Sequence, residues 1–116
     1  MTAIKVRNAV ASDAPMLMVM MRELAVHDGI ADGLETTEEA IRRDGFGAAP
    51  LFRAVIAEAD GEVAGYVSYF ERYSAWKGGP YLAVDDVYVR EAFRAKGVGK
   101  AMMREVRDMA LGKGLN

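Results

Sequence analysis

The segment Tyr81–Gly99, with the sequence YLAVDDVYVREAFRAKGVG, decides the fold of this chain. Its first nine residues, Tyr81–Val89, are mostly apolar and rich in valine and tyrosine, which favours a strand. The loop at residues 94–99, RAKGVG, follows. The apolar residues after it have the spacing of one helix face: Val98, Met102, Val106 and Met109. A strand, a glycine-containing loop and a helix are therefore expected in direct succession.

The loop at residues 94–99 has the features of a phosphate-binding site. The first backbone N–H groups of a helix have no partner within the helix, and they lie at the positive end of its dipole. Gly97 and Gly99 would let a ligand approach the backbone closely. Three cations, Arg94, Lys96 and Lys100, add positive charge. The pattern predicts a site for an anion, with a pyrophosphate as the natural ligand.

Two other phosphate-binding motifs fit this loop less well. A dinucleotide fingerprint G-x-G-x-x-G would need a third glycine where Met102 stands, and the spacing of a Walker loop is absent. The remaining alternative is an ordinary helix start with solvated basic residues. The strand before the loop and the three cations favour the phosphate site.

The sequence before this segment predicts a strand and two helices. Residues 4–8 alternate apolar and polar side chains, as in a strand. Ser12 can cap a first helix, whose apolar face follows the i, i+3, i+4, i+7 spacing. That face consists of Leu17, Met20, Met21 and Leu24. Thr36 and Glu39 form a capping box for a second, shorter helix, which we expect to end at Gly45 in the left-handed conformation.

Three strands are expected between the second helix and the loop. Residues 52–59 form a β-rich run, and Asp60-Gly61 is a strong signal for a hairpin into a return strand at residues 62–70. Residues 73–80 contain two glycines, a proline and the only tryptophan, which predicts a loop before the strand Tyr81–Val89. The order is then strand, helix, helix, strand, strand, strand, helix. Residues 1–116 are therefore expected to form one α/β domain.

Composition narrows the classes of function. The chain has no cysteine, which excludes disulfides and cysteine nucleophiles, and its single histidine, His27, cannot build a multi-histidine metal site. We expect no metal. No apolar run approaches the ~18 residues of a membrane span, and the N-terminus lacks the layout of a signal peptide, so a cytoplasmic location without a membrane partner is expected. With a net charge of -2 and scattered basic residues, no nucleic-acid partner is expected.

The end of the chain bears on assembly. A strand followed by a helix is normally completed by a further strand that pairs back into the sheet. The chain ends at Asn116, where such a strand would begin. We therefore expect one edge of the strand Tyr81–Val89 to lack a partner. A homodimer or higher oligomer, joined near this strand and the last helix, would cover it.

The motif R-x-x-G-x-G after a strand resembles the pyrophosphate-binding motif of the GCN5-related N-acetyltransferases, the GNAT family. Further stretches resemble the spermidine/spermine and diamine acetyltransferase branch of that family. They are Arg22-Glu23-Leu24-Ala25, Asp44-Gly45-Phe46-Gly47, Ala57-Glu58, Gly65-Tyr66, Tyr73 with Trp76, and Asp85-Asp86-Val87-Tyr88-Val89. The resemblance runs over nearly the whole chain. It implies the GNAT fold, a mixed, mostly antiparallel central sheet flanked by helices, here without the C-terminal strands and last helix of that fold.

The resemblance also implies acetyl-CoA as a co-substrate. Backbone groups of Val87 and Val89 would hold the pantetheine arm as an added strand is held. The pyrophosphate would lie against the loop, whose implied cofactor-binding residues are Arg94, Ala95, Lys96, Gly97, Val98, Gly99 and Lys100. The reaction would be direct attack of a neutral amine on the thioester. It needs an amine held close and a base that takes up its proton.

Asp85 and Asp86 are the main candidates on the acceptor side. Neighbouring residues of a strand point to opposite faces, so only one of the two would reach the site unless the strand bulges. Regular alternation would place Asp85 on the face of Val87, and Asp86 on the face of Val84. The family branch has a glutamate at the position of Asp85, thought to accept a proton through water. The resemblance implies Asp85 as the catalytic base and Asp86 as a substrate-binding residue, and a salt bridge or a loop cap is the alternative for either.

Three further residues are implied on the acceptor side. Glu23 and Asp28, near the end of the first helix, would attract a cationic acceptor, and Trp76 would form a wall of its cleft. A solvated helix face and a loop anchor are the respective alternatives. Ser74 stands where the diamine branch often has an acidic residue, which leaves other amines open.

The implied function is that of an N-acetyltransferase, which moves the acetyl group of acetyl-CoA to a primary amine of a small molecule. A diamine, a polyamine or an amino-acid-like amine is expected, and the sequence does not choose among them. The family's tyrosine general acid would lie beyond Asn116, and every tyrosine present lies upstream, so no general acid is assigned. The alternative is a catalytically inactive module that binds acetyl-CoA or mediates dimerisation.

Overall fold

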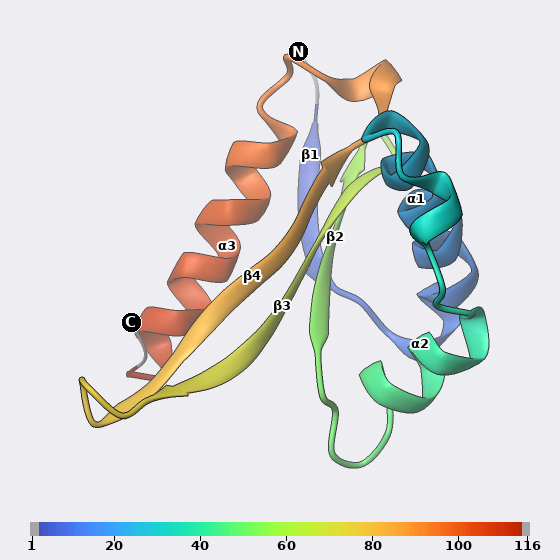
Figure 1. Cartoon of the computed structure of the whole chain (residues 1–116). Coiled ribbons are helices and arrows are strands. Elements are labelled where there is room, and N and C mark those ends of the chain that lie inside the picture. Colours follow the sequence, from blue (N-terminus) through green and yellow to red (C-terminus); the bar gives the residue numbers. More distant parts are fainter. Residues whose placement is uncertain (1–2, 115–116) are drawn as a thin grey trace.

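Four antiparallel strands form a sheet between two layers of helix in the computed structural model, which describes residues 3–114 (Figure 1). The strand order is β1-β2-β3-β4. The strands are β1 (Ile4–Asn8), β2 (Arg53–Ala59), β3 (Glu62–Ser74) and β4 (Gly79–Val89). The helices are α1 (Ala14–His27), α2 (Glu38–Gly45) and α3 (Val98–Gly112), with short 3-10 turns at Ala11–Asp13, Ala31–Gly33 and Glu91–Phe93. No helix within the described residues is long and apolar enough to cross a bilayer.

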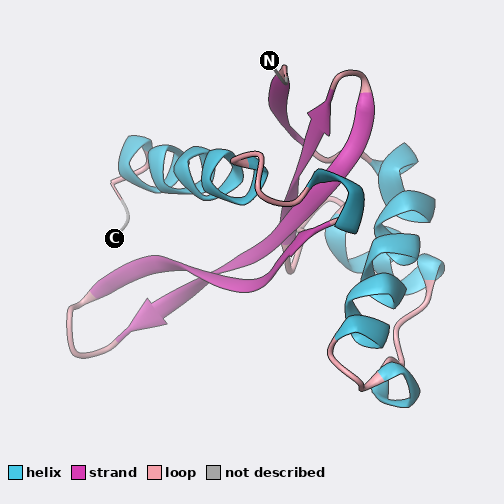
Figure 2. Ribbon diagram, turned by 90° about the horizontal axis from the view of Figure 1, so that it is seen from above, coloured by secondary structure: helices cyan, strands magenta, loops and turns pink. Residues whose placement is uncertain are grey.

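The helices cover opposite faces of the sheet. Helices α1 and α2 lie on one face and α3 lies on the other, as the two perpendicular views show (Figures 1 and 2). The core between the sheet and the pair α1 and α2 contains Leu17, Met20, Ile41, Ile56 and Tyr66. The core between the sheet and α3 contains Val55, Val67, Val98, Met102 and Val106. The predicted α/β class, the element order and the apolar face of the last helix are confirmed.

The two hairpins differ in how well the sequence predicts them. The tight turn at Asp60-Gly61 is confirmed, because both residues have positive φ, 52° and 85°, as a type I′ hairpin requires. The loop predicted at residues 73–80 is too long: β3 continues to Ser74, β4 begins at Gly79, and the turn is confined to residues 75–78. Cross-strand pairing keeps this arm extended, and Pro80 is tolerated because β4 is an edge strand.

Both predicted ends of α2 need correction. The capping residue is Thr37 rather than Thr36, because Thr37 has the extended backbone of an N-cap and its Oγ1 accepts the N–H of Ala40 at 3.1 Å. Gly45 ends the helix but does not have a positive φ. A Cβ at Gly45 would lie 2.7 Å from the ring of Phe52, so this glycine serves close packing instead of a left-handed cap.

A β-bulge in β3 brings the end of β4 close to the sheet. The pairing with β2 shifts by one residue between Ala57 and Glu58, which makes Ala64 the extra residue of β3. At the next position, a side chain on Gly65 would collide with the carbonyl oxygen of Tyr88. Glycine is therefore required there, opposite the last residues of β4.

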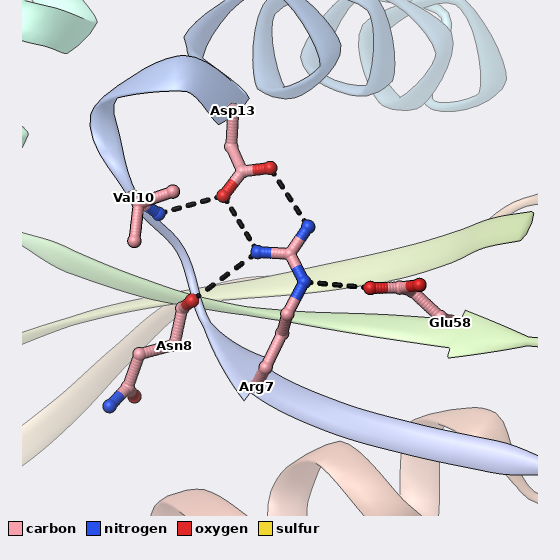
Figure 3. Close-up of polar contacts among 5 residues, drawn as sticks. All are labelled: Arg7, Asn8, Val10, Asp13 and Glu58. Atoms are coloured by element: carbon pink, nitrogen blue, oxygen red, sulfur yellow. Dashed lines mark hydrogen bonds and ion pairs between the residues drawn. The ribbon is translucent and has the colours of Figure 1, made fainter. Parts of the chain in front are cut away.

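A partly buried ion cluster joins β1, β2 and the start of α1 (Figure 3). The guanidinium of Arg7 donates to both carboxylate oxygens of Asp13 at 2.8 and 2.9 Å, and its Nε donates to Glu58 at 2.7 Å. Asp13 also accepts the backbone N–H of Val10 at 2.7 Å. Helix α1 therefore begins after Asp13, one residue beyond the predicted cap at Ser12.

We predict that the Asp13→Asn variant loses about 1–3 kcal/mol of unfolding free energy at pH 7, because it removes a charged partner of Arg7. Hydrogen bonding to Arg7 lowers the pKa of Asp13 below its ordinary value of 3.8. A lowered carboxyl pKa stabilises the fold above that ordinary value, and this stability is lost as the pH falls through the lower pKa of the folded state. Urea unfolding of both proteins at a series of pH values should show the difference shrinking below pH 4.

The matched control is Glu38→Gln, which breaks the exposed i,i+4 pair of Glu38 with Arg42. That change should cost no more than about 0.5 kcal/mol. A difference between wild type and Asp13→Asn that stays constant from neutral to acid pH would contradict a role for the Asp13 charge.

Candidate active site

The loop at residues 94–99 presents free backbone donors at the start of α3. The first helical bond runs from the N–H of Ala101 to the carbonyl of Gly97 at 3.0 Å. Within the described part of the chain, the N–H groups of residues 95–100 donate to no acceptor. Ala95 and Gly97 both have positive φ, 63° and 83°, so the loop folds into the concave turn that suits an anion.

The side chains of this loop divide into core and surface. Val98 is buried under the sheet, so only its backbone can face a ligand. Lys96 and Lys100 are exposed, and Arg94 is held in place: its Nε donates to the carbonyl of Val89 at 3.0 Å, and its guanidinium lies 6.0 Å from the ring centre of Tyr88. The predicted cofactor-binding residues thus lie at the end of β4, in the loop and in the first turn of α3, and their binding of a cofactor stays a prediction.

The outer edge of β4 offers backbone groups next to this loop. The N–H of Arg90 donates to Ala64 in β3 at 2.8 Å. Because alternate residues of an antiparallel strand direct their backbone groups to the same side, those of Val87 and Val89 point away from β3. No strand among residues 3–114 pairs with that edge. Use of this edge by a pantetheine arm, or by a second copy of the chain, stays a prediction.

A bulge in β4 determines which faces of the sheet Asp85 and Asp86 occupy. Ser68 pairs with Asp86 but Tyr69 pairs with Val84, so Asp85 is an extra residue. Pairs in register share a face, which places Val84 with Tyr69 on the α3 side and Asp86 with Ser68 on the side of α1 and α2. The expectation that Asp86 shares the face of Val84 is therefore wrong, because the bulge interrupts the alternation.

Both aspartates line one cavity of about 440 Å³ between the sheet, α1 and α2. We call it the acidic pocket. Four carboxylates line it, and no basic side chain of the described residues does: Asp28, Asp44, Asp85 and Asp86. The rest of its wall is mostly apolar and includes Met21, Leu24, Ile41, Leu51 and Phe52. Among residues 3–114, no group of acidic or histidine side chains converges closely enough to hold a metal ion. The pocket therefore suits an organic cation with an apolar portion.

Asp86 is the half-buried carboxylate of the acidic pocket, whereas Asp85 is exposed at its rim. Oδ2 of Asp86 accepts the hydroxyls of Tyr66 and Ser68, each at 3.4 Å. Burial raises the pKa of Asp86 above its ordinary value, and the charge of Asp85 adds to this, while the two hydroxyls oppose it. Burial also raises the pKa of Tyr66, so its hydroxyl stays protonated and donates.

The other predicted acceptor residues are spread over the molecule. Asp28 follows the last turn of α1 and lines the acidic pocket. Glu23 lies on another side of α1, where its carboxylate accepts two hydrogen bonds from Arg90, at 3.0 and 3.1 Å, and one from Tyr88 at 3.1 Å. Trp76 is fully exposed at the tip of the β3–β4 hairpin and does not line the acidic pocket.

A second, larger cavity of about 1280 Å³ lies beside Glu23, between α1 and the end of β4. Its wall includes Arg22, Tyr88, Arg90 and Arg94. Arg94 lines this cavity and is also the first residue of the loop at residues 94–99, so the cavity lies next to the loop. The structure thus places the Glu23–Arg90 pair on the loop side of α1, and the acidic pocket on the other side.

Sequence reasoning did not assign a site role to several residues that line the acidic pocket, among them Asp44, Tyr66 and Ser68. Asp44 lines the acidic pocket from α2, and its Oδ2 forms an ion pair with Nη2 of Arg43 at 3.0 Å. Tyr66 and Ser68 alternate along β3, which marks them as neighbours on one face. Only the bulge-shifted register identifies Asp86 as their partner across the strands, and no residue pattern reveals that register.

We predict that Asp86→Asn makes the fold more stable at neutral pH. A carboxyl whose pKa is raised on folding binds protons more readily in the folded state, so its contribution to stability becomes less favourable as the pH rises through that window. Asparagine carries no charge and avoids this cost. Thermal unfolding should show a higher midpoint for the variant at pH 7 and nearly equal midpoints near pH 3. A variant less stable than wild type at pH 7 would contradict the expectation that the charge of Asp86 destabilises the fold.

Comparison with known proteins adds the family. The model of the Acetyltransferase (GNAT) family matches residues 18–116. Thialysine N-epsilon-acetyltransferase from Bos taurus is 35% identical over 98% of this chain and 71% of that protein. Spermidine/spermine N(1)-acetyltransferase-like protein 1 from Homo sapiens is 32% identical over 92% of this chain and 16% of that protein.

Solved structures agree with the fold described above. An aminoglycoside acetyltransferase from a soil metagenomic sample, in complex with sisomicin, has a TM-score of 0.79 at 14% identity, over 97% of this chain and 73% of that one. Ribosomal-protein-alanine N-acetyltransferase from Brucella melitensis also has a TM-score of 0.79, at 21% identity, over 98% of this chain and 76% of that one. At these identities the likeness concerns the fold alone. Together with the family model and the relatives in sequence, it shows that this chain belongs to the GNAT family of acetyltransferases.

Proposed function

We propose that this protein transfers the acetyl group of acetyl-CoA to a primary amine of a small cationic molecule. The observation that carries this proposal is the acidic pocket, whose four carboxylates include two, Asp85 and Asp86, from the edge strand β4. A positively charged amine would be attracted to this pocket. The relatives named for thialysine and for spermidine/spermine support an amine as the acceptor. The cytoplasmic location stays a prediction.

The cofactor would lie along β4 and over the loop at residues 94–99. Backbone donors of residues 95–100 would bind the pyrophosphate, with Lys96, Lys100 and Arg94 adding charge. The outward backbone groups of Val87 and Val89 would hold the pantetheine arm. In this arrangement the thioester comes to the middle of β4, where the bulge places Asp85.

Asp85 would take up the proton that the amine must lose. A free primary amine has a pKa near ~10 and is mostly protonated at neutral pH, so a base is needed before attack. The exposed carboxylate of Asp85 can accept this proton directly or through water. The neutral nitrogen then attacks the thioester carbon and a C–N bond forms. The C–S bond breaks, and the second proton that the nitrogen loses passes through water to the departing thiolate, which leaves as the thiol of CoA. Asp86 and Asp28 would hold the remaining positive charge of the acceptor.

We predict that Gly97→Val abolishes CoA binding. Gly97 has a φ of 83°, which a β-branched residue rarely adopts, so the turn that presents the N–H groups would be lost. Gly78→Val is the matched control, because Gly78 has a φ of 71° at the tip of the β3–β4 hairpin, outside the loop. Calorimetry should show wild-type affinity for CoA in the control and none in Gly97→Val. Wild-type affinity should also fall as salt rises.

We predict that Asp85→Asn lowers amine acetylation by ~10²-fold or more while CoA binding is unchanged. Release of the CoA thiol can be followed with a thiol reagent, because the protein has no cysteine to react. The acceptor panel should include thialysine, spermidine, lysine and an uncharged primary amide. Asp32→Asn is the control, since it removes an exposed carboxylate that does not line the acidic pocket.

Two outcomes of this assay would count against the proposal. Unchanged turnover in Asp85→Asn would show that another group takes up the proton. Wild-type protein that binds CoA but acetylates none of the amines would favour the alternative, an acetyl-CoA-binding module without catalysis.

A further inference from the structure

We propose that Ser68 and Tyr66 are positioning residues for the amine acceptor. They hold one oxygen of Asp86, Oδ2, and leave the other, Oδ1, to face the positive charge of the substrate. This inference rests on the proposed function and concerns the same acidic pocket. Neither residue is proposed to touch the reacting atoms.

Ser68 fixes both the backbone and the carboxylate of Asp86. Its Oγ accepts the backbone N–H of Asp86 at 3.1 Å and donates to Oδ2 of the same residue at 3.4 Å. A serine hydroxyl has one proton and two lone pairs, so it can do both at once. The contact lies next to the extra residue Asp85, where the β3–β4 ladder shifts by one position. One side chain therefore satisfies the N–H beside the bulge and orients the carboxylate.

Tyr66 supplies a second donor to the same oxygen. Its hydroxyl lies 3.4 Å from Oδ2 of Asp86, and its ring is fully buried under α1 and α2. Ser68 is only 4% exposed. Because both hydroxyls are held by the core, they are in place before any ligand binds. Within residues 3–114, Oδ1 of Asp86 receives no hydrogen bond, so it is the oxygen available to an ammonium group.

The charges around Asp86 explain why these two donors matter. It faces Asp85 from its own strand, Asp28 from α1 and Asp44 from α2, and all three are acidic. Burial, and the charges of Asp85 and Asp28, favour the protonated form, which cannot pair with a cation. The hydroxyls of Tyr66 and Ser68 favour the anion. They would thereby set the lowest pH at which the acidic pocket binds an amine.

The test measures the binding of thialysine and of spermidine to Ser68→Ala and Tyr66→Phe, by calorimetry in the presence of CoA, from pH 5 to pH 9. Each variant removes one hydroxyl and leaves the carbon framework nearly unchanged. We expect each to weaken amine binding ~10-fold near pH 6, since a hydrogen bond to a charged group is lost. The pH midpoint of binding should move upward in both variants. KM for the amine should rise while kcat changes little, and Ser68→Thr should restore binding because it keeps the hydroxyl.

Ser74→Ala is the matched control. Its hydroxyl also accepts a backbone N–H on the β3–β4 hairpin, that of Lys77 at 3.2 Å, but it does not line the acidic pocket. It should bind both amines as wild type does. Wild-type affinity and an unmoved pH midpoint in Ser68→Ala and Tyr66→Phe would overturn the inference, and so would an equal loss in Ser74→Ala.

Failure of the proposed function would look different from failure of this inference. If wild-type protein binds CoA but neither amine at any pH, the acidic pocket is not an amine site, and the positioning role falls with it. If wild type binds the amines and the hydroxyl variants match it, only the positioning role is wrong.

Discussion

The β-bulge at Asp85, the extra residue of β4, is the constraint on which the site depends. If β4 were regular there, the β3–β4 ladder would continue in register, and Asp85 and Asp86 would point to opposite faces of the sheet. With the bulge, both carboxylates border one cavity, and the strand on either side keeps a buried face. Leu82 packs under α3 before the bulge, and Tyr88 packs under α1 after it. A single inserted residue therefore switches the face of β4 that packs in the core, from the α3 side before the bulge to the α1 side after it.

The proposed cofactor loop and acceptor pocket are both connected to β4, whose end packs closely against β3. Gly65 lets β3 approach the backbone at Tyr88, where any side chain would collide. Arg94 then ties the loop back to the carbonyl of Val89. These contacts place the start of α3, with its free N–H groups, at a fixed distance along the strand from the bulge. The loop at residues 94–99 and the acidic pocket thus lie along one edge strand, the loop beyond its end and the pocket near its middle.

The acidic pocket shows the usual conflict between a functional charge and stability. Four carboxylates around a mostly apolar cavity repel one another, and burial disfavours the charge on Asp86 in particular. The fold reduces this cost with two buried hydroxyls and with Arg43, which shares the charge of Asp44. Glu23 lies outside this conflict, because Arg90 and Tyr88 engage its carboxylate on the other side of α1. The acidic side chains on the two sides of α1 therefore have different electrostatic surroundings.

Patterns that depend on near neighbours could be read from the sequence alone. The helix faces, the Asp60-Gly61 turn, the order of elements along the chain and the glycine loop at residues 94–99 all follow from spacing and local backbone preference. The family resemblance rested on the same loop and on the Asp85-Asp86 pair. Local preference misjudged residues 73–80, where glycine and proline predicted a loop, but cross-strand pairing extends the strands almost to the turn.

Only the tertiary structure decided which distant side chains meet. The sequence left open whether β4 bulges, because a bulge depends on the pairing of two strands and not on one segment. That register brings Tyr66 and Ser68 to Asp86 and places Glu23 against Arg90, and no local pattern encodes either contact. Trp76, expected in the acceptor cleft, lies fully exposed because the hairpin extends beyond the helices. The sequence determined the elements and the chemistry they carry. Packing across strands decided the geometry, since it depends on contacts between residues far apart in the chain.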